Sequence, residues 1–142
     1  MTLAGIELAY LVKEIGTEIQ DYYVSNIWGI NRNSLLFKLH HPKKPDIMLT
    51  VSSIGIWITS KKIDPIEPNK LLRRLRSDLL RSKIEKIEQI GTERIAYITF
   101  SNFDNRFILI IEFFGDGNLL LCNYNKKILA LLKECFFHLL RS

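Results

Sequence analysis

The sequence predicts an α+β fold, in which an antiparallel β-sandwich of about eight strands is flanked by helices. Three observations support this fold class. Apolar residues near the start of the chain, and again after residue 70, recur every three or four positions, as in amphipathic helices. Two groups of four short β-branched or apolar runs follow these segments, separated by turn-forming residues. The length of 142 residues, 47% of them hydrophobic, suits one folded domain.

The first half of the chain is expected to open with a helix over residues 3–22, with Thr2 as its N-cap. Four strands follow, which we expect at residues 24–28, 34–40, 47–51 and 54–59. In the last of these, Ile54, Ile56 and Ile58 alternate with other residues, which predicts a strand covered on one face.

A connector with two prolines, residues 64–68, begins the second half. We expect a helix from Lys70 to about Ser82, with Asn69 as its N-cap and a buried stripe of leucines. Four more strands are expected at residues 84–90, 94–100, 107–113 and 118–122, with hairpin turns at 104–105 and 115–117. A closing helix is expected over residues 126–140. Because it is apolar on nearly all sides, either it lies deep in the domain or the natural protein continues.

Positive charge is concentrated in one segment. Residues 70–86 contain seven Lys or Arg against two acids, a surplus of five that equals the net charge of +5 of the whole chain. Residues 1–30 contain one Lys against four acids. A local basic cluster on a nearly neutral protein favours docking of a polyanion, and the alternative is a solvated helix face.

Residues suited to catalysis or metal binding are sparse. His40 and His41 are adjacent at a strand end, and His138 is alone in an apolar helix, so none has the spacing of a zinc site. Cys122 lies in an apolar strand, where a structural thiol is more common than a nucleophile. Glu112 interrupts an apolar run, and a lone acid gives no acid–base couple. We therefore expect no enzyme activity, no cofactor and no metal.

The sequence also bears on the compartment. Its longest apolar runs fall far short of the roughly 18–20 residues that span a bilayer. The acidic start is unlike a secretory signal, and two cysteines do not form a disulfide framework. We expect a cytoplasmic protein that contacts no membrane.

Several stretches resemble motifs of one family. Residues 75–79, Leu-Arg-Ser-Asp-Leu, and residues 89–95, Gln-Ile-Gly-Thr-Glu-Arg-Ile, are similar to a helix motif and a Q-x-G-x-D-R-I signature of the NFACT N-terminal domain. Residues 112–121 resemble its E-x-x-G-x-G-N hairpin, and residues 24–28 its V-x-N-I-Y strand. The spacings agree over the whole chain, so we expect residues 1–142 to form this domain as the first part of a longer protein.

The resemblance implies a ribosome-associated quality-control factor of the RqcH type, historically labelled fibronectin-binding. Such proteins bind the large ribosomal subunit obstructed by peptidyl-tRNA, recruit tRNA and support template-free C-terminal tailing of the stalled chain. The implied partners are tRNA and that subunit, with no small-molecule substrate. The implied fold is similar to the N-terminal sandwich of formamidopyrimidine-DNA glycosylases.

The expected tRNA- or RNA-binding residues are Glu93, Arg94, Arg73, Arg74, Arg76, Arg81 and Lys83. On a continuous helix, Arg73, Arg76 and Lys83 would lie near one face, with Arg74 and Arg81 on a flank. Two departures from the family pattern stand out: Glu93 replaces an Asp, and Ser77 replaces a Lys.

Other interpretations of these residues stay open. Glu93 and Arg94 could form only an exposed ion pair, and Trp28 and Trp57 are expected in the core. The alternative function is a DNA-binding or DNA-repair domain on the glycosylase-like scaffold. Glycosylase chemistry itself is disfavoured because those enzymes use an N-terminal proline amine, and no proline precedes Pro42. A third possibility is an adhesion domain.

Overall fold

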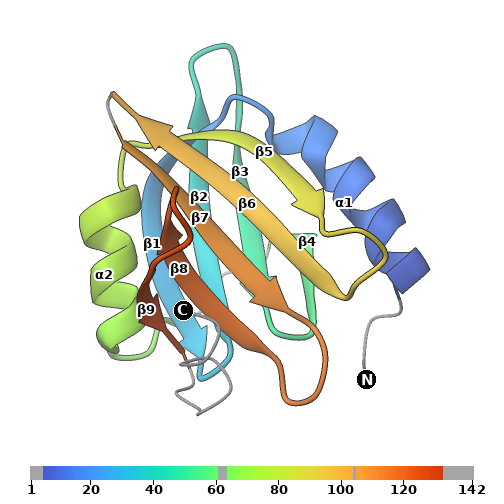
Figure 1. The fold of residues 1–142 in the computed structure, drawn as a ribbon. Helices are drawn as coiled ribbons and strands as arrows, with labels where there is room; N and C mark the ends of the chain where they lie inside the picture. Colours follow the sequence, from blue (N-terminus) through green and yellow to red (C-terminus); the bar gives the residue numbers. More distant parts are fainter. Residues whose placement is uncertain (1–4, 61–63, 104, 133–142) are drawn as a thin grey trace.

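The protein is described by a computed structural model covering residues 5–60, 64–103 and 105–132 (Figure 1). These residues form two helices and a single antiparallel sheet of nine strands in the order β4-β3-β2-β1-β5-β6-β7-β8-β9. The α+β class is confirmed. The sheet contains one strand more than expected and is continuous rather than two separate layers.

The N-terminal half matches the expected order of elements. It contains α1 (Gly5–Ile19), β1 (Tyr23–Asn31), β2 (Ser34–His41), β3 (Lys44–Ser52) and β4 (Gly55–Ile58). The first three strands are longer than expected because their hairpins turn within two residues, at positions 32–33 and 42–43. Thr2 lies outside the described residues.

The C-terminal half contains α2 (Lys70–Leu79), β5 (Lys83–Gln89), β6 (Ile95–Asn102), β7 (Asn105–Glu112), β8 (Asn118–Asn123) and β9 (Ile128–Leu131). The Asn69 cap is confirmed, since its side-chain oxygen accepts a hydrogen bond from the Leu72 amide at 2.8 Å. The helix ends before Ser82 because Arg81 adopts a left-handed φ of 70°, and the Ser82 hydroxyl donates to the Leu79 carbonyl at 2.6 Å.

The closing helix expected over residues 126–140 is wrong at its start, where the chain forms β9. The Asn123 side chain accepts hydrogen bonds from the amides of Asn125 and Lys127, and Lys126 adopts a left-handed φ of 66°. This tight turn returns the chain antiparallel to β8, where Ala130 pairs with Leu121. Residues 133–140 lie outside the described residues.

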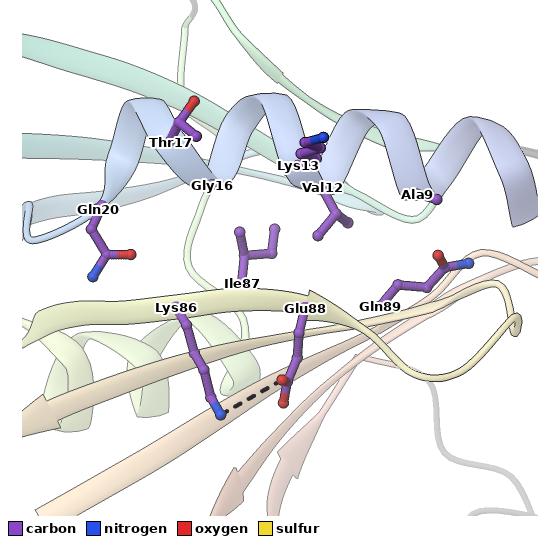
Figure 2. A pocket seen from close by; sticks show the side chains of 10 residues that line it. All are labelled: Ala9, Val12, Lys13, Gly16, Thr17, Gln20, Lys86, Ile87, Glu88 and Gln89. Atoms are coloured by element: carbon purple, nitrogen blue, oxygen red, sulfur yellow. Dashed lines mark ion pairs between the residues drawn. The ribbon is translucent and has the colours of Figure 1, made fainter.

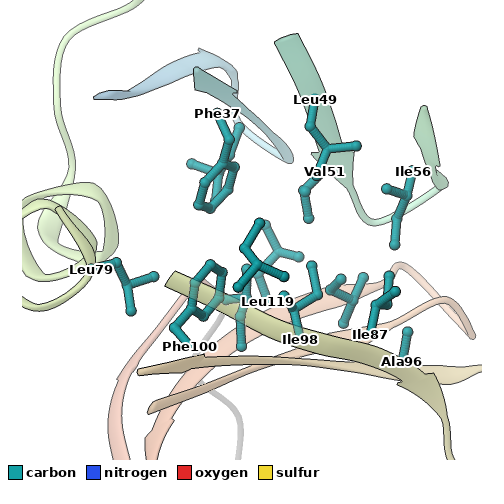
Figure 3. Packing of buried hydrophobic residues seen from close by; sticks show 14 of the residues in the cluster. Phe37, Leu49, Val51, Ile56, Leu79, Ile87, Ala96, Ile98, Phe100 and Leu119 are labelled. Carbon is teal, nitrogen blue, oxygen red and sulfur yellow. The ribbon is translucent and has the colours of Figure 1, made fainter. Parts of the chain in front are cut away.

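The core lies between two facing halves of the sheet, β1–β4 and β5–β9. Adjacent strands β1 and β5 share one residue pair, Tyr23 and Lys83, with backbone hydrogen bonds on either side of it, so the ladder between the two halves is short. Figure 3 shows side chains of β2, β3 and β4 meeting those of β5, β6 and β8, and the Phe37 and Phe100 rings stack at 6.1 Å. Helix α1 packs on β5 and β4, and α2 packs on β1 and β9, so each helix bridges the two halves.

Strand β4 differs from its expected pattern. Gly55 and Ile56 are buried, whereas Ile54, Trp57 and Ile58 are 63%, 42% and 45% exposed. Ile54 belongs to the turn before the strand, and β4 is a four-residue strand at the edge of the sheet. The expectations of an alternating covered face and of a core Trp57 are therefore wrong, and Trp28 is half-buried.

Gly117 is the point where the β7–β8 turn meets the β3–β4 turn. Its φ is 76°, and a Cβ there would lie 2.2 Å from the Ser53 Cβ. Gly115 has a similar φ of 59° but open space around it. Substitutions at these two glycines therefore distinguish the energetic cost of backbone strain from the cost of a steric collision.

We predict that Gly117→Ala lowers the free energy of unfolding by about 3 kcal/mol or more, because left-handed strain adds to the collision with Ser53. Gly115→Ala, the matched control, should cost about 1 kcal/mol from strain alone. Urea unfolding of both variants measures the difference. Equal losses would mean that the contact between the turns contributes nothing.

Candidate nucleic-acid interface

Helix α2 presents cations to solvent because its leucines occupy the opposite side. Leu71, Leu72, Leu75 and Leu79 are all buried. With 3.6 residues per turn, this places Lys70, Arg73 and Arg74 on the outer side of the helix, where all three are exposed. Of the expected RNA-binding residues on this helix, Arg73 and Arg74 are therefore accessible.

The arginines of α2 differ in how they are held. The Arg74 Nε donates to an Asp78 carboxylate oxygen at 2.6 Å, an i,i+4 ion pair along the helix. The Arg76 Nε donates to the backbone carbonyl of Ile27 in β1 at 2.8 Å, and Arg76 is half-buried. Arg76 thus fastens α2 to the sheet, which limits its reach toward a ligand.

Lys83 does not share a helix face with Arg73 and Arg76, which corrects the sequence-based placement. It lies at the start of β5 because α2 has already ended, and its Nζ is 3.7 Å from an Asp21 carboxylate oxygen. Lys86 is also in β5 and lies 3.6 Å from a Glu88 carboxylate oxygen.

Arg81 is positioned by the connection from α2 to β5. Its amide donates to the Val24 carbonyl at 2.8 Å, and the Val24 amide donates to the Ser82 carbonyl at 2.9 Å, while its side chain stays exposed. Among the described residues, Lys70, Arg73 and Arg81 have no carboxylate at ion-pair distance. We call Lys70, Arg73, Arg74 and Arg81 the α2 basic surface, which spans about 15 Å along the helix.

The second candidate site is the turn between β5 and β6, residues 90–94. Its backbone is closed by hydrogen bonds between Glu93 and Ile90 at 3.0 Å and between Ile90 and Ile95 at 3.0 Å. Glu93 is exposed and Arg94 is half-buried just before β6. Within the described ranges no ion pair joins these two side chains.

Gln89 organises this turn, a role that sequence analysis did not assign. Its side-chain Nε2 donates to the Glu93 carbonyl at 2.8 Å and to the Gly5 carbonyl at 3.0 Å. The turn is thereby tied to the start of α1, where a Cβ on Gly5 would lie 2.8 Å from the Thr92 carbonyl oxygen. The signal available in the sequence was the Gln of the signature over residues 89–95.

The two candidate sites lie at opposite ends of β5. Figure 1 shows α2 on the left and the β5–β6 turn on the right. Seven strand residues between them correspond to about 20 Å. A ligand that contacts both must therefore be large.

The other reactive residues are not assembled into a site. His40 Nδ1 lies 3.0 Å from an Asp46 carboxylate oxygen at an exposed position, and Glu112 is buried. In the described part of the chain, no three His, Cys, Asp or Glu gather as metal ligands, and no helix is long and apolar enough to cross a membrane. His138 lies outside the described residues.

The chain was compared with protein families and curated relatives. The model for NFACT N-terminal and middle domains matches residues 4–141. Ribosome quality control complex subunit 2 of Saccharomyces cerevisiae is 30% identical over 141 residues, covering 96% of this chain and 13% of that protein. The archaeal Rqc2 homolog aRqcH of Methanocaldococcus jannaschii is 33% identical over 104 residues, covering 70% of this chain and 15% of that protein. The chain thus spans a small part of these relatives.

Solved structures share the fold. The N-terminal domain of fibronectin-binding protein PavA from Streptococcus pneumoniae superposes with a TM-score of 0.86 at 27% identity, covering 94% of this chain and 55% of that one. The fibrinogen-binding protein from Staphylococcus aureus gives a TM-score of 0.83 at 22% identity, covering 97% of this chain and 53% of that one.

The Cys122 thiol gives a prediction about pH. Burial raises its pKa from 9.0 to about 11, although the positive charge of Lys126 acts in the opposite direction. The unfolded chain loses this proton near pH 9, so between about pH 9 and 11 it binds fewer protons than the native state. The stability from the buried thiol is present below pH 9 and is lost as pH rises through this window.

We expect the difference in unfolding free energy between the wild type and Cys122→Ala to shrink from pH 8 to pH 10.5, because the variant has no thiol to ionise. Urea unfolding at the two pH values measures it. If this difference in unfolding free energy did not change with pH, the thiol of the native protein would be in contact with water and its pKa would not be raised.

Proposed function

The chain belongs to the NFACT family, and on that premise we propose that it is the RNA-binding module of a ribosome-associated quality-control factor. In this proposal it engages tRNA and the large ribosomal subunit obstructed by peptidyl-tRNA, in the cytoplasm, and supports C-terminal tailing of stalled chains. The observation that carries the proposal is the exposed α2 basic surface on a chain whose relatives are named as ribosome quality control subunits.

The chemistry of the α2 basic surface suits an RNA backbone. Guanidinium groups bind phosphate oxygens through paired hydrogen bonds and do not need a particular base sequence. Lys70, Arg73 and Arg81 are exposed, and no described carboxylate pairs with them, so binding phosphate breaks no ion pair there. A protein that binds many different tRNAs needs such phosphate contacts, because they do not depend on the base sequence.

The β5–β6 turn supplies the second contact in this proposal. Arg94 is half-buried, and the Gln89 bridge fixes the turn that carries it, so its guanidinium is presented from a rigid support. The strand length of about 20 Å that separates the turn from α2 is within the reach of a single tRNA. The proposal assigns no chemistry, cofactor or small-molecule substrate to the module.

A DNA-binding or DNA-repair function on a glycosylase-like scaffold is the alternative, since phosphate contacts alone do not distinguish the two nucleic acids. Competition of labelled tRNA with unlabelled duplex DNA in a gel shift separates them. Preference for the duplex would favour the alternative.

We predict that tRNA binding by the chain depends steeply on salt. If about four phosphates are contacted, the slope of log affinity against log salt concentration should be about −3 to −4. The triple variant Lys70→Ala, Arg73→Ala, Arg81→Gly should flatten the slope by about two or more. Gly is chosen at position 81 because its φ of 70° suits glycine.

The matched control for this prediction is Lys43→Ala, Lys44→Ala, Lys127→Ala, which removes the same charge from exposed positions elsewhere. Arg76 is left intact because its bond to Ile27 supports the fold. If both triple variants change the slope equally, the α2 basic surface is not the RNA site.

We predict that Arg94→Ala weakens tRNA binding by about 1–3 kcal/mol, the range for a charge-assisted hydrogen bond. The free energy of unfolding should change by less than about 1 kcal/mol, because the turn is closed by backbone and Gln89 bonds. Arg32→Ala, in the exposed β1–β2 turn, is the arginine control. Normal tRNA affinity with a lowered melting temperature would assign Arg94 a purely structural role.

A further inference from the structure

The two flanks of α1 carry different charges. Figure 2 shows the flank facing β5, where Lys13 and Lys86 line a groove of about 650 Å³ together with Glu88. The opposite flank, which faces β4, carries Glu14 and Glu18. Glu14 and Glu18 therefore lie on the side of the helix that faces β4.

A second groove of about 300 Å³ lies between this acidic flank and β4. Its lining residues are Leu11, Glu14, Ile15, Glu18, Trp57 and Ile58. Trp57 and Ile58 are 42% and 45% exposed, and both glutamates are exposed. The groove thus combines an apolar strand wall with an acidic helix wall, and none of these six described residues is basic.

The strand wall also offers backbone groups. Strand β4 is at the edge of the sheet, and β3 is its one strand partner among the described residues. The Thr59 amide donates to the Met48 carbonyl at 2.8 Å, so the alternation of an antiparallel ladder turns the N–H and C=O of Ile58 away from β3. Such an edge can pair with an added extended segment.

The electrostatic field in the groove is negative, because Glu14 and Glu18 are the charged side chains in its described lining. The buried Tyr22 phenol has a raised pKa, first because of burial and then because of the negative charges of Glu18 and Asp46. Phosphate is repelled by such a field, and cations are attracted. The groove is therefore not part of the proposed RNA-binding surface. Helix α2, which carries the α2 basic surface, lies on the other side of the molecule (Figure 1).

We propose that the groove between α1 and β4 binds an extended, basic segment of a partner protein in which cationic and apolar side chains alternate. Along an extended chain, successive side chains point to opposite sides. Apolar side chains would rest on Trp57, Ile58 and Leu11, and the alternate cations would lie against Glu14 and Glu18. This binding site goes beyond the proposed RNA-binding function and does not depend on it.

The experiment titrates the 142-residue chain into a fluorescently labelled (Lys-Val)5 peptide and follows fluorescence anisotropy. Two further probes, (Lys-Gly)5 and (Glu-Val)5, remove the apolar side chains or reverse the charge. We expect (Lys-Val)5 to bind at least fivefold tighter than (Lys-Gly)5, and (Glu-Val)5 not to bind. Equal affinities for the two lysine peptides would overturn the proposal, as would no binding of (Lys-Val)5.

Paired variants test the position of the site. Glu14→Lys with Glu18→Lys should weaken (Lys-Val)5 binding at least tenfold. The control Glu67→Lys with Glu88→Lys makes the same change in net charge outside the groove and should change the affinity less than twofold. Equal losses in both pairs would mean diffuse attraction, and the proposal would fail.

Trp57→Ser tests the apolar wall independently of charge, and its exposure of 42% makes a folding defect small. We expect at least a tenfold loss of (Lys-Val)5 affinity with unchanged tRNA affinity. Loss of tRNA affinity instead would make the groove an RNA surface. A dimer in sedimentation that Trp57→Ser dissociates would make the occupant a second copy of the chain.

Discussion

The fold depends on burial of apolar side chains between the two facing halves of one sheet. The backbone ladder that joins the halves is short, because its hydrogen bonds lie within residues 21–24 and 81–84. The stacking of Phe37 on Phe100, with the aliphatic side chains around them, holds the halves together beyond that short ladder. The helices depend on the same arrangement, since α1 and α2 each pack against strands of both halves. The positions of all the surfaces described above follow from it.

The arrangement of the helices separates the charges of the chain. Each helix turns its apolar side to a gap between the halves and its charged side to solvent. Helix α2 is thereby basic on the outside, and α1 is acidic along the flank beside β4. A polyanion and a basic peptide could therefore occupy the same molecule without competing. The β5–β6 turn, which carries Arg94, lies beside the start of α1. It is therefore separate from the α2 basic surface and from the acidic flank of α1.

Local signals in the sequence predicted much of this fold, and signals that depend on tertiary contacts were missed. Asn69 and the leucines of α2 were identified correctly because capping and helical periodicity are local. Helical periodicity places Lys83 on the helix, because no sequence pattern reveals that Arg81 adopts a left-handed conformation. The sequence predicts a helix at β9 because Ile128–Leu131 suits either structure, and only pairing with β8 decides between them. The exposure of Trp57 follows from the edge position of β4, which the order of strands along the chain does not reveal.

The contact between Gly117 and Ser53 has a consequence for how the chain folds during its own synthesis. These residues, like Phe37 and Phe100, are more than sixty positions apart in the sequence. Such long-range contacts slow folding, because a large loop must close before they form. At about 5–20 residues per second, a ribosome needs on the order of 3–12 s to add the missing half. Until then the apolar face of β1–β4 has no partner half, so this is the interval in which a nascent chain is most exposed to aggregation.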